Sequence, residues 1–166
     1  FERTVTLLKK DLEDDPQNPL TWHYLSCSYL SEGMMNEALE SSLRAIELAR
    51  AKNDRNLIFL WSRYNAAICL YRRKDYDQAQ QIALEALKEH PNHIDSHCIL
   101  LLVAYERGQW TKVLKHGAKY LDLVLRLHSN PMEFGTLVTC SVNEAWNMHV
   151  LIAIGRFELG QVEMFE

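Results

Sequence analysis

Apolar residues recur along most of the chain with the period of an α-helix. Trp22, Leu25 and Tyr29, for example, are spaced i, i+3 and i+7, which places them on one face of a helix. Segments with this period are separated by single glycines and prolines. No segment shows the period-2 alternation and flanking turns of a β-hairpin. The pattern therefore predicts an all-α fold.

The helical segments repeat along the sequence. Gly33, Lys74, Gly108 and Gly160 each precede an apolar residue by five positions, and they follow one another at intervals of 41, 34 and 52 residues. Aligned on these positions, three stretches match closely and a fourth more weakly: TWHYLSCSYLSEGMMNEALESSLRAI, SRYNAAICLYRRKDYDQAQQIALEAL, SHCILLLVAYERGQWTKVLKHGAKYL and NMHVLIAIGRFELGQVEMF. Each copy predicts two helices joined by a tight turn, where a left-handed or tight conformation is expected at the aligned position. Lys74 stands where the other copies have Gly, so modest strain or a different geometry is expected at that turn.

The second helix of each of the first two copies carries two alanines seven residues apart, Ala38 with Ala45 and Ala79 with Ala86. Small side chains at this spacing let paired helices approach closely. With the first helix they give the pattern W-x2-L-x3-Y-x3-G-x4-A-x6-A, which resembles the tetratricopeptide repeat. The resemblance implies a right-handed superhelical solenoid of antiparallel helix pairs, with about three full repeats plus flanking helices.

The expected organisation is a single domain over residues 1–166. Residues 1–15 match the second helix of a preceding unit, full repeats are expected at 19–52, 57–91 and 94–128, and a degenerate or truncated fourth repeat is expected at 141–166. Residues 129–140 form the clearest loop, and Ser141 with Glu144 predicts a capping box that opens the next helix. Because the chain begins with Phe1 and not with Met, we expect it to be a piece of a longer protein.

Composition narrows the class of protein. The 166 residues include 18 basic and 22 acidic side chains, and the formal charge of −4 argues against nucleic-acid binding, which depends on clustered Lys and Arg. The four cysteines lie in apolar, helix-like contexts without a C-x-x-C pair, so we expect reduced thiols and a cytoplasmic location. No apolar run reaches the ~20 residues that span a bilayer.

The first helix of each repeat lines the inner face of such a solenoid, so its side chains are the candidate partner-binding residues. The repeat register places on this face His23, Tyr24, Cys27, Trp61, Tyr64, Asn65, Ile68, Tyr71, Arg72, Cys98, Leu102 and Tyr105. Tyr, Trp and Arg are residue types that anchor protein interfaces. The sequence therefore predicts a groove that binds a peptide, a helix or a second subunit, a second copy of this chain included. The competing interpretation is that some of these aromatics pack against a neighbouring repeat or the last helix.

The sequence predicts no catalytic or metal site within the chain. It contains neither the G-x-S-x-G motif of a nucleophile elbow nor a glycine-rich phosphate loop. His93 and His97 are spaced i, i+4 but lack the Glu of a metalloprotease motif, and surface or packing histidines are the favoured interpretation. We therefore expect no enzyme activity in this chain, no cofactor and no metal ion.

A second resemblance concerns the N-terminus. The stretch FERTVTLLKKDLEDDPQNPLTWHYLSCSY is similar to the junction between the catalytic domain and the tetratricopeptide repeats of bacterial family-2 glycosyltransferases, although Thr4 stands where Asn is usual. The matching residues are Arg3, Leu7, Leu8, Leu12, Asp15, Pro16, Asn18, Tyr24, Leu25 and Tyr29. This resemblance implies an alternative, in which the chain is the accessory region of such an enzyme. The catalytic domain and its metal-binding D-x-D would then lie outside this chain.

Overall fold

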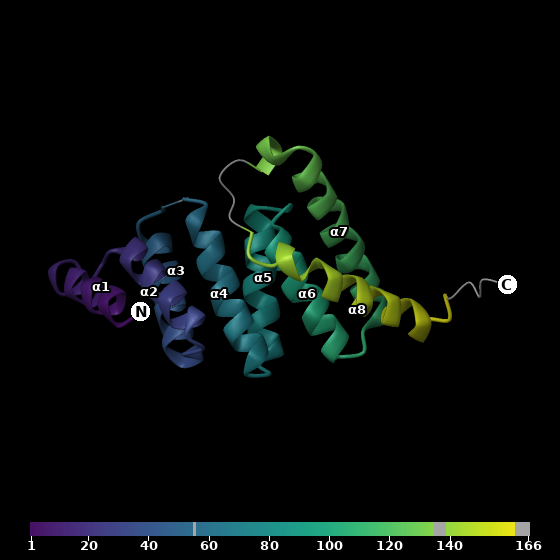
Figure 1. Ribbon diagram of the computed structural model, residues 1–166, viewed down its shortest axis with the longest axis horizontal. Helices are drawn as coiled ribbons and strands as arrows, with labels where there is room; N and C mark the ends of the chain where they lie inside the picture. Colours follow the sequence, from purple (N-terminus) through teal and green to yellow (C-terminus); the bar gives the residue numbers. More distant parts are fainter. Residues whose placement is uncertain (55, 135–138, 162–166) are drawn as a thin grey trace. The chain divides into compact units, whose positions relative to one another are not determined.

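The computed structural model describes residues 1–54, 56–134 and 139–161, and all secondary structure in these residues is helical, which confirms the all-α prediction (Figure 1). The helices are α1 (Glu2–Asp14), α2 (Pro19–Ser31), α3 (Met35–Ala51), α4 (Ile58–Arg72), α5 (Tyr76–Glu89), α6 (Ile94–Glu106), α7 (Trp110–Ser129), the 3-10 turns η1 (Pro131–Phe134) and η2 (Val142–Glu144), and α8 (Ala145–Glu158). Contacts divide the chain into two compact units, Phe1–Ile82 and Ala83–Glu166.

The four aligned positions of the repeat form the same helix-ending turn. Gly33, Lys74, Gly108 and Gly160 have positive φ angles of 74°, 63°, 61° and 66°. At each turn the N–H of the following residue donates to the carbonyl five residues back, as in the 2.9 Å bond from Met34 to the Tyr29 carbonyl. This arrangement is a Schellman motif, which satisfies carbonyls that the helix end leaves without partners. The predicted left-handed backbone is therefore confirmed at all four positions.

Helix α2 begins at a side-chain cap. Asn18 Oδ1 accepts hydrogen bonds from the backbone N–H groups of Leu20 and Thr21, at 3.0 and 3.4 Å, and Pro19 occupies the first turn. The indole Nε1 of Trp22 donates to the carbonyl of Pro16 at 3.0 Å. These bonds fix the connection between α1 and α2.

The core of the first unit lies where α2 and α4 pack against α3 (Figure 1). Ala38 and Ala45 of α3 have no exposed surface, and Leu25 and Tyr29 of α2 are buried. Because the two alanines add little bulk, the helix backbones can approach closely at this contact.

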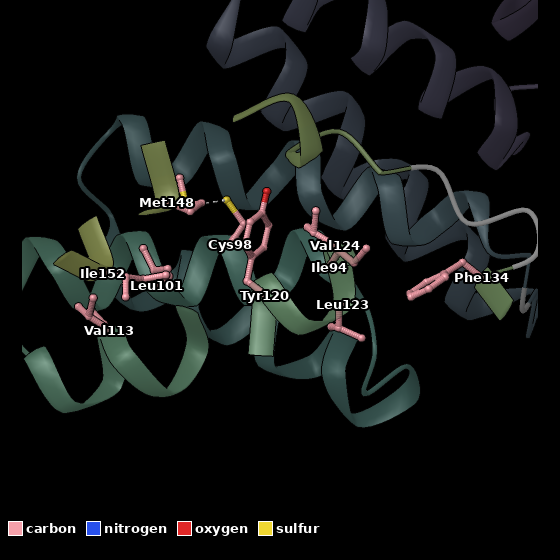
Figure 2. Packing of buried hydrophobic residues seen from close by; sticks show 11 residues of the cluster. Ile94, Cys98, Leu101, Val113, Tyr120, Leu123, Val124, Phe134, Met148 and Ile152 are labelled. Carbon is pink, nitrogen blue, oxygen red and sulfur yellow. Dashed lines mark hydrogen bonds between the residues drawn. The ribbon is translucent and has the colours of Figure 1, made fainter. Parts of the chain in front are cut away.

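In the second unit α7 packs against α6 and α8, and α8 also contacts α6. Figure 2 shows the buried side chains where the three helices meet, with Tyr120 beside Cys98 and Met148. The Tyr120 hydroxyl donates to the carbonyl of Ser141 at 2.7 Å, so the polar end of this buried ring has a partner. At Gly117 of α7 an added Cβ would lie 2.5 Å from Ile152 Cγ1, because α8 crosses α7 at close range.

The connection after α7 contains a short 3-10 turn and packs one side chain into the core of the second unit. Residues 129–140, expected as a loop, include the 3-10 turn Pro131–Phe134, and Phe134 is buried in the core of the second unit. An aromatic side chain at this place anchors the connection to the helices that it joins. Residues 135–138 lie outside the described part of the chain.

Asp95 of α6 fixes the segment that leads into α8. Its carboxylate accepts hydrogen bonds from the backbone N–H of Cys140 at 2.9 Å and of Ser141 at 2.8 Å, and from the Ser141 hydroxyl at 2.6 Å. The serine half of the predicted capping box is therefore wrong. The Ser141 side chain makes no cap bond to the following turn, because its hydroxyl is committed to Asp95.

Candidate functional site

Two of the predicted partner-binding residues, His23 and Asn65, lie in the interior of the first unit with no exposed surface. His23 Nδ1 lies 2.8 Å from the Ser62 hydroxyl, which joins α2 to α4. Asn65 Nδ2 donates to the Ser26 hydroxyl at 3.0 Å and to Cys27 Sγ at 3.4 Å. These contacts place His23 and Asn65 in the packing of α2 against α4 and away from solvent.

Tyr24, Trp61 and Tyr64 give the first unit an accessible aromatic surface. Tyr24 is 48% exposed, and Trp61 and Tyr64 are half-buried. The ring of His23 packs edge-on against both Tyr24 and Trp61, with centroid distances of 5.3 and 5.1 Å. Edge-to-face contacts of this kind are favourable, so the buried imidazole orients two of the three rings.

The remaining predicted residues of α4 differ in accessibility. Ile68 is buried, Tyr71 is half-buried and Arg72 is exposed. The Tyr71 ring packs against Tyr76 at a centroid distance of 5.8 Å, and Arg72 Nη1 donates to Met35 Sδ at 3.7 Å. Arg72 is the charged side chain that this part of the predicted surface leaves accessible.

The three predicted residues of α6 contribute to the core of the second unit. Cys98 is buried, and its Sγ lies 3.8 Å from Met148 Sδ of α8 (Figure 2). Leu102 and Tyr105 are half-buried and pack against the same core, and the Tyr105 ring meets Trp110 edge-on at 5.8 Å. Cys98 therefore packs against α8, the last described helix, and is not accessible to a partner.

The thiol and imidazole on α2 are close together but poorly suited to catalysis. Cys27 Sγ lies 3.6 Å from His23 Nε2. Burial lowers the pKa of His23 to about 4. Burial also raises the pKa of Cys27, although hydrogen bonds from Asn65 and Ser26 act in the opposite direction. Both groups are thus neutral near pH 7, whereas a nucleophilic cysteine needs a thiolate beside a positive charge.

The histidines of the second unit are engaged in separate contacts. His93 Nδ1 lies 2.7 Å from the Ser96 hydroxyl, and His97 Nε2 lies 3.0 Å from the Pro91 carbonyl. Since a carbonyl only accepts, His97 carries its proton on Nε2, and its Nδ1 faces His116 Nδ1 at 3.4 Å. The pKa of His116 is lowered to about 4, chiefly by burial and also by the nearby His97, Lys115 and Lys112.

The described residues contain neither a metal-binding cluster nor a membrane-spanning helix. No three or more His, Cys, Asp or Glu side chains in the described ranges gather as a metal ion would require. No helix within those ranges is long and apolar enough to cross a membrane.

Asp95 has a structural role that the repeat pattern does not predict, since its carboxylate holds the segment before α8. Burial raises the pKa of Asp95, whereas the hydrogen bonds from Ser141 and Cys140 favour its charged form. A second kind of contact, from a ring N–H to a proline carbonyl, was not predicted, although the sequence carries a pattern for it. Trp22 and His97 occupy the same register position, each six residues after a proline, and each ring N–H bonds to that proline's carbonyl at 3.0 Å.

Comparison with known proteins agrees with the repeat architecture. No protein-family model matches the chain. A TPR repeat-containing protein of Methanocaldococcus jannaschii is 37% identical to it over 91 residues. The match covers 55% of this chain and 15% of the relative, so the chain spans a small part of that relative's length. With the recurring helix–turn–helix unit, this similarity supports a tetratricopeptide-type repeat architecture for the matched part of the chain.

Proposed function

We propose that the chain is a protein-interaction scaffold whose first unit binds a peptide, a helix or a second subunit on the aromatic surface of Tyr24, Trp61 and Tyr64. The observation that carries the proposal is the exposure of Tyr24 beside Trp61, with the buried ring of His23 against both. Tyr and Trp offer a large contact area for few rotatable bonds, and they are enriched among residues that dominate binding energy.

The accessible members of the predicted set extend this surface within the first unit. Cys27 and Tyr71 are partly exposed, and Arg72 is exposed. An arginine beside aromatic rings suits a partner that carries a carboxylate or a backbone carbonyl. Three residues of the predicted set are buried and do not belong to this surface: His23, Asn65 and Ile68. The four cysteines form no disulfide within the described residues, which favours a reducing, cytoplasmic setting.

A site-specific photo-crosslinking experiment tests the proposal. A photoreactive phenylalanine analogue replaces Tyr24 in one variant and Leu43 in a matched control, since Leu43 lies on α3 and is 41% exposed. Both variants are irradiated in extract of the source cells. We expect a discrete protein adduct at position 24 that is absent at position 43 and is lost on adding Trp61→Ala. Equal adducts at both positions, or an adduct that persists with Trp61→Ala in a folded chain, would contradict the proposal.

The alternative, an accessory region of a family-2 glycosyltransferase, rests on the N-terminal resemblance alone. Two residues of that resemblance have local roles: the Pro16 carbonyl accepts the Trp22 bond, and Asn18 caps α2. These roles account for both residues without an attached catalytic domain. The sequence upstream of Phe1 in the parent gene tests the alternative, because a strand-rich domain with a D-x-D would support it.

A further inference from the structure

The first unit contains a cavity, here called the α1–α3 cavity, that is lined by side chains of α1, α2 and α3. Helices α1 and α3 both pack against α2, which forms the floor of the cavity between them. The volume of the cavity is about 180 Å³. Drug-sized ligands occupy sites of about 300–1,000 Å³, whereas a cavity of about 150 Å³ accepts benzene. The α1–α3 cavity therefore has the size of a site for one side chain.

The floor of the α1–α3 cavity is aromatic and fixed in place. Trp22 is half-buried and Tyr29 is buried, and both lie on one face of α2. The hydrogen bond from the Trp22 indole to the Pro16 carbonyl, at 3.0 Å, sets the orientation of the ring without a ligand. Lys9 Nζ of α1 lies 6.0 Å from the centre of the Tyr29 ring. The aromatic floor thus already attracts one cation through its ring face.

The wall that α3 contributes offers polar groups without partners. Glu37 and Glu40 are exposed, and neither carboxylate forms an ion pair within the described residues. Ser41 is only 3% exposed. The neighbouring Ser42 hydroxyl donates to the Ala38 carbonyl at 2.7 Å, whereas the Ser41 hydroxyl makes no hydrogen bond in the part of the chain that the structure describes. This wall therefore suits a ligand that donates hydrogen bonds.

The charges of the lining favour a cation. Two carboxylates, Glu37 and Glu40, face a ligand from one side, and a single ammonium, Lys9, faces it from the other. An anionic ligand would be repelled by two charges and attracted by one, and the reverse holds for a cation.

Among cationic side chains, arginine matches the lining best. Its planar guanidinium stacks on aromatic rings and donates two parallel hydrogen bonds to a carboxylate, with further N–H groups left for a hydroxyl such as that of Ser41. Its methylene stem can lie against apolar side chains, and Leu12 and Leu25 line the same cavity. A lysine ammonium is a compact point charge, which lacks the stacking and the paired hydrogen bonds.

The α1–α3 cavity is complete within the first three helices. In a repeat array each unit contacts only its neighbours. A helix before α1 in a longer chain would correspond to α2 in the next repeat, and α2 packs against α3 and α4. By this correspondence the preceding helix would pack against α1 and α2, which leaves the wall of α3 accessible to another protein.

We propose that the α1–α3 cavity binds an arginine side chain of a partner protein, with the guanidinium held between the aromatic floor and the carboxylates of Glu37 and Glu40. This site goes beyond the function proposed above. Tyr24 of the aromatic surface lies roughly 200° around α2 from Trp22, at about 100° per residue, so the two sites use different faces of the helix.

Titration with short peptides tests the proposal. The four tryptophans of the chain are replaced by fluorotryptophan, so that each gives its own fluorine NMR resonance. The probes are acetyl-Gly-Arg-Gly-amide and matched peptides that carry lysine or citrulline, a neutral isostere of arginine. We expect a saturable shift of the Trp22 resonance with the arginine peptide, a smaller shift with the lysine peptide and none with the citrulline peptide. The other three resonances are internal controls and should stay unchanged.

Three variants locate the binding in the cavity. Glu37→Gln combined with Glu40→Gln should weaken binding of the arginine peptide by about fivefold, the scale of accessible ion pairs. Glu47→Gln is the matched control on α3, because Glu47 is exposed and does not line the cavity, and should leave affinity unchanged. Lys9→Gln removes the competing cation and should strengthen binding by about twofold. Circular dichroism of each variant establishes that it folds.

Several outcomes would overturn the inference. These are an unshifted Trp22 resonance, equal shifts with the arginine and citrulline peptides, or equal effects of the double variant and Glu47→Gln. The titration is repeated on the full-length product of the parent gene, where retained binding supports the proposal. Loss of binding there would show that the protein's own residues fill the cavity, and would overturn the assignment to a partner.

The two proposed sites fail separately. Tyr24→Ala should leave the shift of the Trp22 resonance intact, and the double variant of Glu37 and Glu40 should leave crosslinking at position 24 intact.

Discussion

The Ser141 hydroxyl donates a 2.6 Å hydrogen bond to the carboxylate of Asp95, which lies 46 residues earlier in the chain. The same carboxylate also accepts the backbone N–H groups of Cys140 and Ser141, and the Ser141 carbonyl accepts the Tyr120 hydroxyl. Both the α6 and the α7 helices thus hold the segment before α8. The position of α8 depends on this buried polar contact.

Replacing the carboxylate should therefore destabilise the second unit. In Asp95→Asn one oxygen becomes an amide donor that faces the N–H of Cys140 or Ser141, which leaves buried donors without acceptors. We expect a loss of about 1–3 kcal/mol in the free energy of unfolding, measured by urea denaturation. Asp122→Asn on the exposed face of α7 is the control, and a loss of similar size there would contradict the assigned role.

Stability should fall in mild acid because of His23, which is buried, and His116, which is partly buried. In the unfolded chain a histidine has a pKa near 6.5, whereas His23 and His116 have values of about 4 in the folded chain. Between these values the unfolded chain binds more protons, so stability is fully present above about pH 6.5 and declines as the pH falls to about 4. His116→Gln should make this decline smaller, as followed by the urea midpoint from pH 7 to pH 4.5. The exposed His128→Gln serves as control, and identical pH profiles for both variants would count against this origin.

The close contact between α7 and α8 predicts a large difference between two glycines. In Gly117→Ala the new methyl group meets Ile152 Cγ1 at 2.5 Å, and overpacking of this kind costs about 1–3 kcal/mol. In Gly155→Ala the nearest atom is Val113 Cγ1 at 3.1 Å, so the clash is milder and the gain in helix propensity of about 1 kcal/mol offsets it. Thermal unfolding should rank Gly117→Ala well below Gly155→Ala. Adding Ile152→Ala to Gly117→Ala should show favourable coupling, and strict additivity would argue against the clash.

The turn at Lys74 should become more stable with glycine. A side chain at φ 63° costs about 1–2 kcal/mol, while glycine loses roughly 0.4–1 kcal/mol more backbone entropy on folding. Lys74→Gly should therefore raise the free energy of unfolding by on the order of 0.5 kcal/mol. Gly33→Ala tests the reverse change, because no atom lies within 4 Å of the added Cβ and the cost is confined to the backbone. Chemical denaturation of both variants should give shifts of opposite sign, and shifts of the same sign would refute the argument.

Local sequence patterns are sufficient to predict the helices, their turns and their pairing into repeats. These features depend on local chemistry: the 3.6-residue period of apolar positions, the residue with positive φ five positions before an apolar residue of the second helix, and the small side chains at Ala38 and Ala45. Each is encoded within one helix pair and recurs, so the alignment of the copies reveals it without tertiary information.

The exposure of each residue of the predicted groove depends on tertiary contacts between neighbouring helices. Repeat register assigns a face to a side chain, but burial depends on what the neighbouring helix places opposite it. His23 and Asn65 are buried because Ser62 and Ser26 offer them hydrogen bonds across the contact of α2 with α4, and Cys98 is buried because Met148 lies against it. Tyr24 lies on the same predicted face, but 48% of its surface is exposed. The contact between Asp95 and Ser141 likewise joins residues far apart in the sequence, and no local pattern specifies it.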